Sequence, residues 1–145
     1  MSYENYIETV DMLRRYKRVI FIGSEILVNS LNILQNLMIT TGQHVYCLTD
    51  LNGQENFLSK TTQDDLIIVL STNGKWYNAE YSKSTIKTLH QSKAYKSLWT
   101  MNTKHTDKDI FNHILLFGDQ SKGLGYIQFN YLAIFLVEFY SKGII

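Results

Sequence analysis

The sequence predicts an α/β fold, a doubly wound five-stranded parallel sheet with helices on both faces, formed by one domain over residues 1–145. Two observations predict this fold. Short apolar runs alternate along the chain with segments of helical periodicity, as in successive strand–helix–strand units. The first three runs are also apolar on both faces, and such strands belong in a parallel sheet that helices cover on both sides.

The first half of the chain begins with an amphipathic helix over residues 3–16, where apolar residues recur at helical spacing between charged ones. A buried strand, a long helix and a second strand follow, over residues 18–23, 25–41 and 44–50. We expect Ser24 to cap the start of the long helix and Gly42 to cap its end. Cys47 in the second strand is expected to be a small core residue.

The second half continues the alternation with a short helix, a third strand and a helix that opens at Asn78, over residues 52–62, 65–71 and 78–90. Two more strands and a final helix are predicted over residues 96–102, 112–118 and 124–141. The final helix is apolar almost all round, so it must be buried or shared with a partner. We therefore expect a homodimer with this helix, or the helix 25–41, in the interface.

Composition excludes several classes of function. The formal net charge of +1 gives no basic surplus for nucleic-acid binding. The single cysteine excludes an internal disulfide and indicates a reducing, cytoplasmic location. The most apolar stretch, Tyr126 to Tyr140, is shorter than the roughly 20 residues that span a bilayer, so no membrane association is expected. The four histidines lack metal-ligand spacing, and no catalytic set is evident. We thus expect no metal, no cofactor and no catalytic residue.

Two loops lie where doubly wound sheets bind ligands, at the carboxyl ends of strands. They are "GSE" after the first strand and "STNGKW" after the third. Their small residues expose backbone N–H groups that hold anions. The candidate ligand-binding residues are Gly23, Ser24, Glu25, Ser71, Thr72, Asn73, Gly74, Lys75 and Trp76. Each also has a structural interpretation, such as helix capping by Ser24, turn formation by Asn73 and packing of the Trp76 indole.

The order of these parts resembles the sugar isomerase (SIS) domain, specifically the effector domain of RpiR-type transcriptional regulators. The segment "VIFIGSEILVNSLNILQNLMITTGQHVY" is similar to that family's strand, G-x-G-x-S turn, long helix and second strand. "DDLIIVLSTNGKWYNAE" resembles its D-x-x-I-x-x-S-x-S-G-x-T-x-E segment, and the apolar helix after "DQSKGLG" lies where these domains end. The resemblance covers Val19 to Phe139. It implies that the two loops hold the phosphate of a sugar phosphate or a related small anion, and that the domain forms a dimer.

The first loop matches the family's G-x-G-x-S pattern only in part. Phe21 stands where the family has its first glycine, and Gly23 matches the second. Either Glu25 or, with a shift of one residue, Ser24 falls on the family's serine. A carboxylate about 5 Å from a phosphate adds about 3 kcal/mol of repulsion per phosphate charge at an effective dielectric near 20.

In the second loop, Ser71 and Gly74 match the family pattern, whereas Asn73 replaces a serine and Trp76 replaces a threonine. Each lost hydrogen bond to a charged group costs about 1.5–3 kcal/mol. Since micromolar binding amounts to only about 8 kcal/mol, the site needs compensation, for which Lys75 is the candidate. The loop therefore keeps the shape of an anion cradle and has lost part of its chemistry.

Three functions are consistent with this sequence. The first is the phosphosugar-sensing effector domain of a bacterial RpiR-type regulator, which contacts DNA only through a helix-turn-helix domain absent from this chain. The second is a small SIS-fold sugar phosphate isomerase, for which Glu25, Glu55, Glu80 and His90 are the available bases. The third is a ligand-free dimerisation scaffold.

Overall fold

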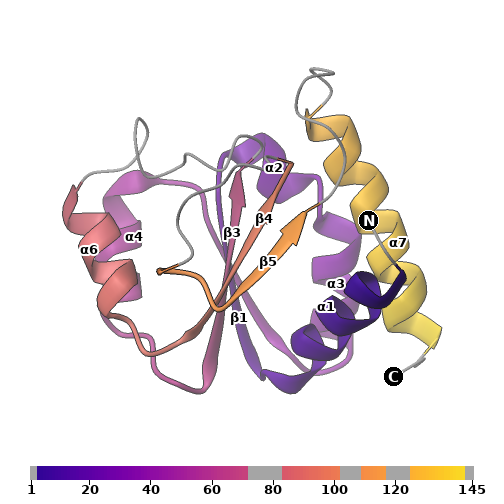
Figure 1. Cartoon of the computed structure of the whole chain (residues 1–145), viewed down its shortest axis with the longest axis horizontal. Helices are drawn as coiled ribbons and strands as arrows, with labels where there is room; N and C mark the ends of the chain where they lie inside the picture. Colours follow the sequence, from indigo (N-terminus) through magenta and orange to yellow (C-terminus); the bar gives the residue numbers. More distant parts are fainter. Residues whose placement is uncertain (1–2, 72–82, 102–108, 117–124, 143–145) are drawn as a thin grey trace.

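The computed structural model describes residues 3–71, 83–101, 109–116 and 125–142, and within these it has a parallel five-stranded sheet (Figure 1). The strand order is β2-β1-β3-β4-β5, and every neighbouring pair is parallel. The strands are β1 (Arg18–Ile22), β2 (His44–Leu48), β3 (Asp65–Ser71), β4 (Tyr95–Thr100) and β5 (His113–Leu116). The predicted doubly wound α/β fold is confirmed.

Helices cover both faces of the sheet (Figure 1). One layer contains α1 (Tyr3–Arg15), α2 (Glu25–Asn29), α3 (Asn32–Thr40) and α7 (Gly125–Lys142). The other contains α4 (Leu51–Leu58) and α6 (Lys83–Gln91). The helix α7 packs against α1, α2 and α3, while α4 packs against α6. The two ends of the chain therefore lie in the same layer.

The core is divided by the sheet because successive strand residues point to opposite faces. Phe21, Ile68 and Trp99 belong to the cluster beneath α1, α3 and α7, and Phe21 meets Trp99 edge to face at 6.1 Å between ring centroids. Their neighbours Ile20 and Leu98 belong to the cluster beneath α4 and α6. The central strand β3 is buried along its whole length, as its continuous apolar run predicts.

The single helix predicted over residues 25–41 is wrong, because the chain forms α2 and α3 with a break at Ser30 and Leu31. The Ser30 hydroxyl donates to the carbonyl of Leu27 at 2.5 Å, and the carbonyl of Val28 accepts from the N–H of Leu31 at 3.2 Å and from Gln35 Nε2 at 3.0 Å, so the regular helical bonds are replaced at this point. The end of α3 is as predicted. Gly42 adopts a φ of +99°, and the N–H of Gln43 reaches the carbonyl of Met38 at 3.0 Å, as in a Schellman motif.

The strand β2 differs from the prediction that the first three strands are covered on both faces. It lies at the edge of the sheet, and His44, Tyr46 and Cys47 are exposed. The expectation that Cys47 is a core residue is therefore wrong. An apolar strand sequence does not distinguish a central position from an edge position, and at the edge fewer elements are available to cover the side chains.

The remaining helix boundaries differ by a few residues. The helix predicted over 52–62 ends at Leu58, and the helix predicted over 78–90 is described only from Lys83 to Gln91. The proposed cap at Asn78 lies outside the described residues.

Candidate functional site

The strand order places a topological switch point between β1 and β3. The chain leaves β1 toward β2 on one side and returns to β3 on the other, so the loops after β1 and β3 diverge from adjacent strands. Ile22 is paired with Val69, and the two strands run in the same direction. The residues after Ile22 and those around Ser71 therefore meet at the carboxyl edge of the sheet, where the sequence predicts an anion site.

Gly23 is favoured by close packing at this edge. It is buried, and a Cβ atom added to it would lie 3.1 Å from both the Cβ and the carbonyl oxygen of Leu70. The backbone after β1 thus approaches β3 so closely that a larger residue would have to displace Leu70 by a few tenths of an ångström. Its N–H donates to the carbonyl oxygen of Leu48 at 3.4 Å, which ties the loop to the end of β2 as well.

Ser24 acts as the predicted N-cap. Its hydroxyl accepts a hydrogen bond from the N–H of Leu27 at 3.4 Å, and Glu25 lies in the first turn of α2. Both residues are exposed at the carboxyl edge. The capping role of Ser24 is confirmed, and its second lone pair remains able to accept from a ligand donor.

Ser71 ends β3 and is buried, with 6% of its surface exposed. It pairs in register with Thr100, which is also buried and ends β4. The two hydroxyl-bearing residues thus extend the polar edge from β3 to β4. The other predicted site residues, Thr72, Asn73, Gly74, Lys75 and Trp76, lie outside the described residues.

Gln54 also lies at the carboxyl edge, although no sequence pattern distinguishes it. It stands on α4, is fully buried, and donates from Nε2 to the carbonyl oxygen of Leu48 at 3.1 Å. That carbonyl is the same acceptor that Gly23 uses. Within the described part of the chain, its Oε1 is the buried side-chain oxygen that lacks a hydrogen-bond partner. A lone glutamine in a short helix carries no recognisable sequence signal.

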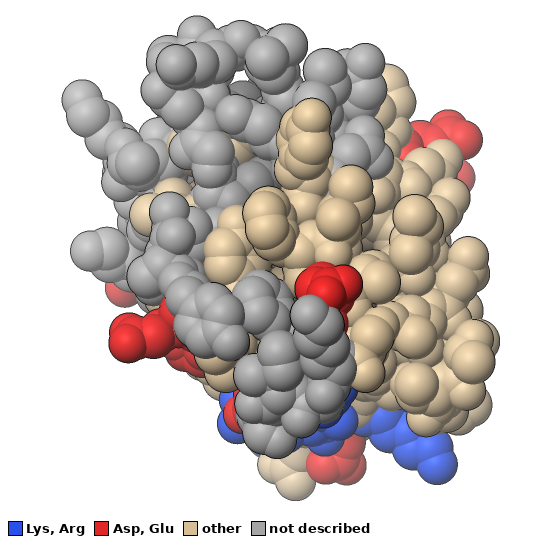
Figure 2. All heavy atoms as spheres, turned by 90° about the vertical axis from the view of Figure 1, so that its right-hand side faces the viewer, with Lys and Arg blue, Asp and Glu red and all other residues tan. Residues whose placement is uncertain are grey.

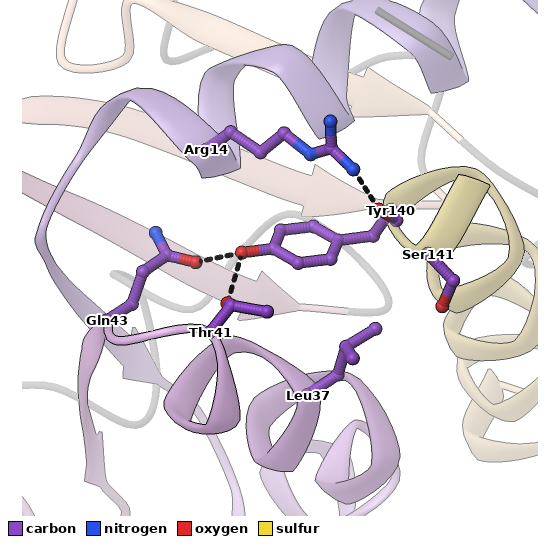
Figure 3. A pocket seen from close by; sticks show the side chains of 6 residues that line it. All are labelled: Arg14, Leu37, Thr41, Gln43, Tyr140 and Ser141. Carbon is purple, nitrogen blue, oxygen red and sulfur yellow. Dashed lines mark hydrogen bonds between the residues drawn. The ribbon is translucent and has the colours of Figure 1, made fainter. Parts of the chain in front are cut away.

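A cavity of about 450 Å³ lies at the other edge of the sheet, where the strands begin (Figure 3). Its lining residues are Arg14, Leu37, Thr41, Gln43, Tyr140 and Ser141.

The polar groups that line this cavity are largely bonded to the protein itself. The Tyr140 hydroxyl donates to Gln43 Oε1 at 2.5 Å and lies 2.9 Å from Thr41 Oγ1. Gln43 Nε2 donates to the carbonyl of Leu13, and Arg14 donates to the carbonyl of Tyr140. These bonds join the ends of α1, α3 and α7, so we interpret the cavity as a structural junction.

Buried polar groups on β4 and β5 serve packing as well. Ser97 Oγ lies 2.7 Å from His113 Nδ1 and accepts from Trp99 Nε1 at 3.0 Å. Burial lowers the pKa of His113, so the neutral ring is favoured. Burial also lowers the pKa of Lys96, whose Nζ donates to the carbonyl of His90 at the end of α6 at 3.4 Å.

Within the described ranges, no group of three or more His, Cys, Asp or Glu residues that could hold a metal ion occurs. Nor do these ranges contain a helix with the length and hydropathy needed to cross a membrane.

Comparison with known proteins places the fold. No protein-family model matches the sequence, and no curated protein matches it. Several solved structures are similar to the chain. The Vibrio vulnificus NanR protein complexed with ManNAc-6P is 14% identical with a TM-score of 0.75, over 99% of this chain and 55% of that protein.

Two other solved structures are similar. The sugar isomerase domain of an RpiR transcription factor from Sphaerobacter thermophilus is 16% identical with a TM-score of 0.73, over 98% of this chain and 79% of that one. A proposed phosphosugar isomerase involved in capsule formation, from Bacteroides fragilis, is 14% identical with a TM-score of 0.67, over 99% and 81%. The chain thus spans about half of NanR and about four-fifths of the other two chains. These likenesses confirm the predicted resemblance at the level of the fold: the chain has the α/β fold of a sugar isomerase (SIS) domain.

Proposed function

We propose that this chain is the effector-binding SIS domain of a bacterial RpiR-type transcriptional regulator, and that it takes a sugar phosphate or a related small anion at the carboxyl ends of β1 and β3. One observation carries the proposal. The tight turn at Gly23 and the hydroxyl-bearing residues Ser24 and Ser71 converge at the switch point of a 2-1-3-4-5 sheet. The similarity to NanR, whose structure contains ManNAc-6P, supports the same ligand class.

Calorimetry with a panel of hexose and pentose phosphates, including ManNAc-6P, tests the proposal. The Ser71→Ala variant is expected to bind more weakly than the wild type, because a hydrogen bond to a charged group contributes about 1.5–3 kcal/mol. Ser59→Ala, at an exposed serine on the far end of α4, is the matched control and should bind as the wild type does. Absence of binding to every member of the panel would contradict the proposal.

A sugar phosphate isomerase is the second candidate, and the similarity to the Bacteroides protein favours it. Isomerisation requires a base that moves a proton between adjacent carbons. Glu25 is the carboxylate that the described residues place at the start of α2, beside the candidate site. Turnover of any phosphosugar in the panel, abolished by Glu25→Gln, would favour the enzyme, whereas binding without turnover favours the sensor. We propose a cytoplasmic location and DNA contact only through a domain outside this chain.

We also propose that the domain is a homodimer. Large apolar side chains are exposed on three helices of one layer, with exposed fractions between 50% and 66%: Ile26 on α2, Ile33 and Ile39 on α3, and Tyr131, Ile134 and Phe135 on α7. In Figure 2 most of the described surface of this face is uncharged; Lys and Arg side chains lie along its lower edge, and an acidic side chain lies near its middle. Monomeric proteins seldom expose apolar patches of this extent.

Sedimentation at tens of micromolar tests the dimer. The wild type is expected to sediment as a dimer and Ile134→Asp as a monomer, because a buried unpaired carboxylate opposes association. Lys60→Glu, on the exposed end of the opposite layer, changes charge away from the patch and should remain a dimer. A monomeric wild type would contradict the proposal.

A further inference from the structure

The side chain of Gln54 occupies a position next to the candidate site that local packing does not explain. Its Nε2 bonds to the carbonyl of Leu48, 3.1 Å away, and that carbonyl also accepts from the N–H of Gly23. The carboxamide is therefore connected through one shared acceptor to the backbone that opens the first loop. Gln54 is fully buried, so bulk water does not solvate it.

The oxygen of the Gln54 carboxamide lacks a hydrogen-bond partner. Gln54 Oε1 is buried and makes no hydrogen bond, counted over the residues that the structure describes. Such an atom lowers stability, because it has lost its hydrogen bonds to water and gained none in the protein. A leucine would fill a similar volume without this cost, and the Leu48 carbonyl would keep its bond from Gly23. An unsatisfied buried group in a native protein calls for an explanation, and a contact with a ligand is one.

We propose that Gln54 Oε1 is a specificity contact for the sugar part of a sugar phosphate, and that it accepts a hydrogen bond from a ligand hydroxyl or amide N–H. This inference rests on the proposed function. A carboxamide oxygen only accepts hydrogen bonds, and the doubly ionised phosphate of a sugar phosphate has no hydrogen to donate. The partner is therefore on the sugar. Because the oxygen is covered in the ligand-free protein, the ligand reaches it by displacing the atoms that cover it.

Under this proposal, phosphate binding and sugar recognition depend on different residues. The loops around Gly23 and Ser71 would hold the phosphate, and Gln54 would recognise the sugar. Loss of the Gln54 oxygen should then weaken the binding of a sugar phosphate and spare the binding of inorganic phosphate. A merely structural role would change both affinities together or change neither.

The experiment compares Gln54→Leu with the wild-type chain by calorimetry, using ManNAc-6P, ribose 5-phosphate and inorganic phosphate as probes. We expect at least fivefold weaker binding of the sugar phosphate that binds the wild type, about 1 kcal/mol, and inorganic phosphate affinity within twofold. The free energy of unfolding in urea should be equal to or higher than that of the wild type. Gln54→Met is the second variant if Gln54→Leu does not fold.

Gln35→Leu is the matched control. Gln35 is also a buried glutamine that donates to a backbone carbonyl, that of Val28, at 3.0 Å. Its replacement should lower stability without changing the preference for sugar phosphate over inorganic phosphate. Unchanged sugar phosphate affinity in Gln54→Leu, or an equal loss for inorganic phosphate, would overturn the inference and leave the proposed function standing. If the wild type binds none of these probes and no other member of the hexose and pentose phosphate panel, both are overturned.

Discussion

The Tyr140 hydroxyl is expected to stabilise the junction at the amino edge of the sheet, and the Tyr140→Phe variant measures how much. The hydroxyl lies within hydrogen-bond distance of Gln43 Oε1, at 2.5 Å, and of Thr41 Oγ1, at 2.9 Å. Thr41 Oγ1 also lies 2.9 Å from the carbonyl of Met38. Only two hydroxyl hydrogens, those of Tyr140 and Thr41, are available for these three contacts. The Tyr140 hydroxyl can donate to only one acceptor at a time.

The loss of stability expected for Tyr140→Phe follows from these donors and acceptors. Tyr140→Phe removes one donor and deprives Gln43 Oε1 of the Tyr140 hydrogen bond, while Thr41 keeps its bond to Met38. Loss of a hydrogen bond that leaves a buried acceptor costs about 1–3 kcal/mol, and the partial exposure of Gln43 favours the lower half of that range, about 1.5 kcal/mol. For a chain of 145 residues the unfolding entropy is about 0.3 kcal/mol/K, so Tm should fall by about 5 °C.

Urea unfolding and thermal scans of three proteins provide the test. Tyr46→Phe is the control, since Tyr46 lies on the edge strand β2 with 38% of its surface exposed, outside the proposed dimer patch, and should cost less than about 0.5 kcal/mol. The expected order of stability is wild type, then Tyr46→Phe close to it, then Tyr140→Phe. If Tyr140→Phe is no less stable than Tyr46→Phe, the junction does not stabilise the fold in the way described.

Three further predictions concern the histidine on β5 and the candidate site. Burial holds the pKa of His113 below its ordinary value of 6.5, so on acidification the unfolded chain takes up the proton before the folded chain does. The free energy of unfolding should therefore fall as pH drops from about 6.5 through the lower pKa of the folded state. In urea titrations at several pH values, His113→Gln should not show that part of the decline. Glu25→Ser combined with Asn73→Ser should raise phosphosugar affinity at least tenfold, about 1.4 kcal/mol, in calorimetry; no gain would show that these residues do not oppose the anion. In a Trp99→Phe background, Trp76 fluorescence should change saturably at millimolar sugar phosphate or below, because Trp76 belongs to the loop that the proposed function assigns to the ligand. A shielded signal that does not respond to phosphosugars would indicate that the indole fills the pocket and would count against ligand binding.

The order and type of the elements could be predicted because the apolar pattern is strong where the sheet is central. The strand β3 is a continuous apolar run, and its full burial follows from its position between β1 and β4. The same reasoning failed at β2, whose sequence "HVYCL" is equally apolar. Strand position is set by how the whole chain winds, and local periodicity does not contain that information.

The candidate site was predictable to the extent that it depends on strand ends. Gly23, Ser24 and Ser71 could be located because small residues directly follow apolar runs, and the structure brings the ends of these two strands together. Gln54 could not be located, because its importance arises from burial and from an unbonded oxygen. The break at Ser30 was also missed, since a hydroxyl residue inside an apolar helical pattern is usually tolerated: Thr9 in α1 bonds to the carbonyl of Asn5 without a break.

The polar groups at the two edges of the sheet differ in how many of their hydrogen bonds are already made within the protein. This difference favours one edge for the proposed ligand site. At the amino edge there is a cavity of about 450 Å³, yet Tyr140, Gln43 and Thr41 already bond to one another and to helix ends. A ligand there would have to replace existing hydrogen bonds, so its net gain is small. At the carboxyl edge, Gln54 Oε1 has no bond to lose. Unused hydrogen-bonding capacity, more than cavity volume, therefore favours the carboxyl edge as the binding site.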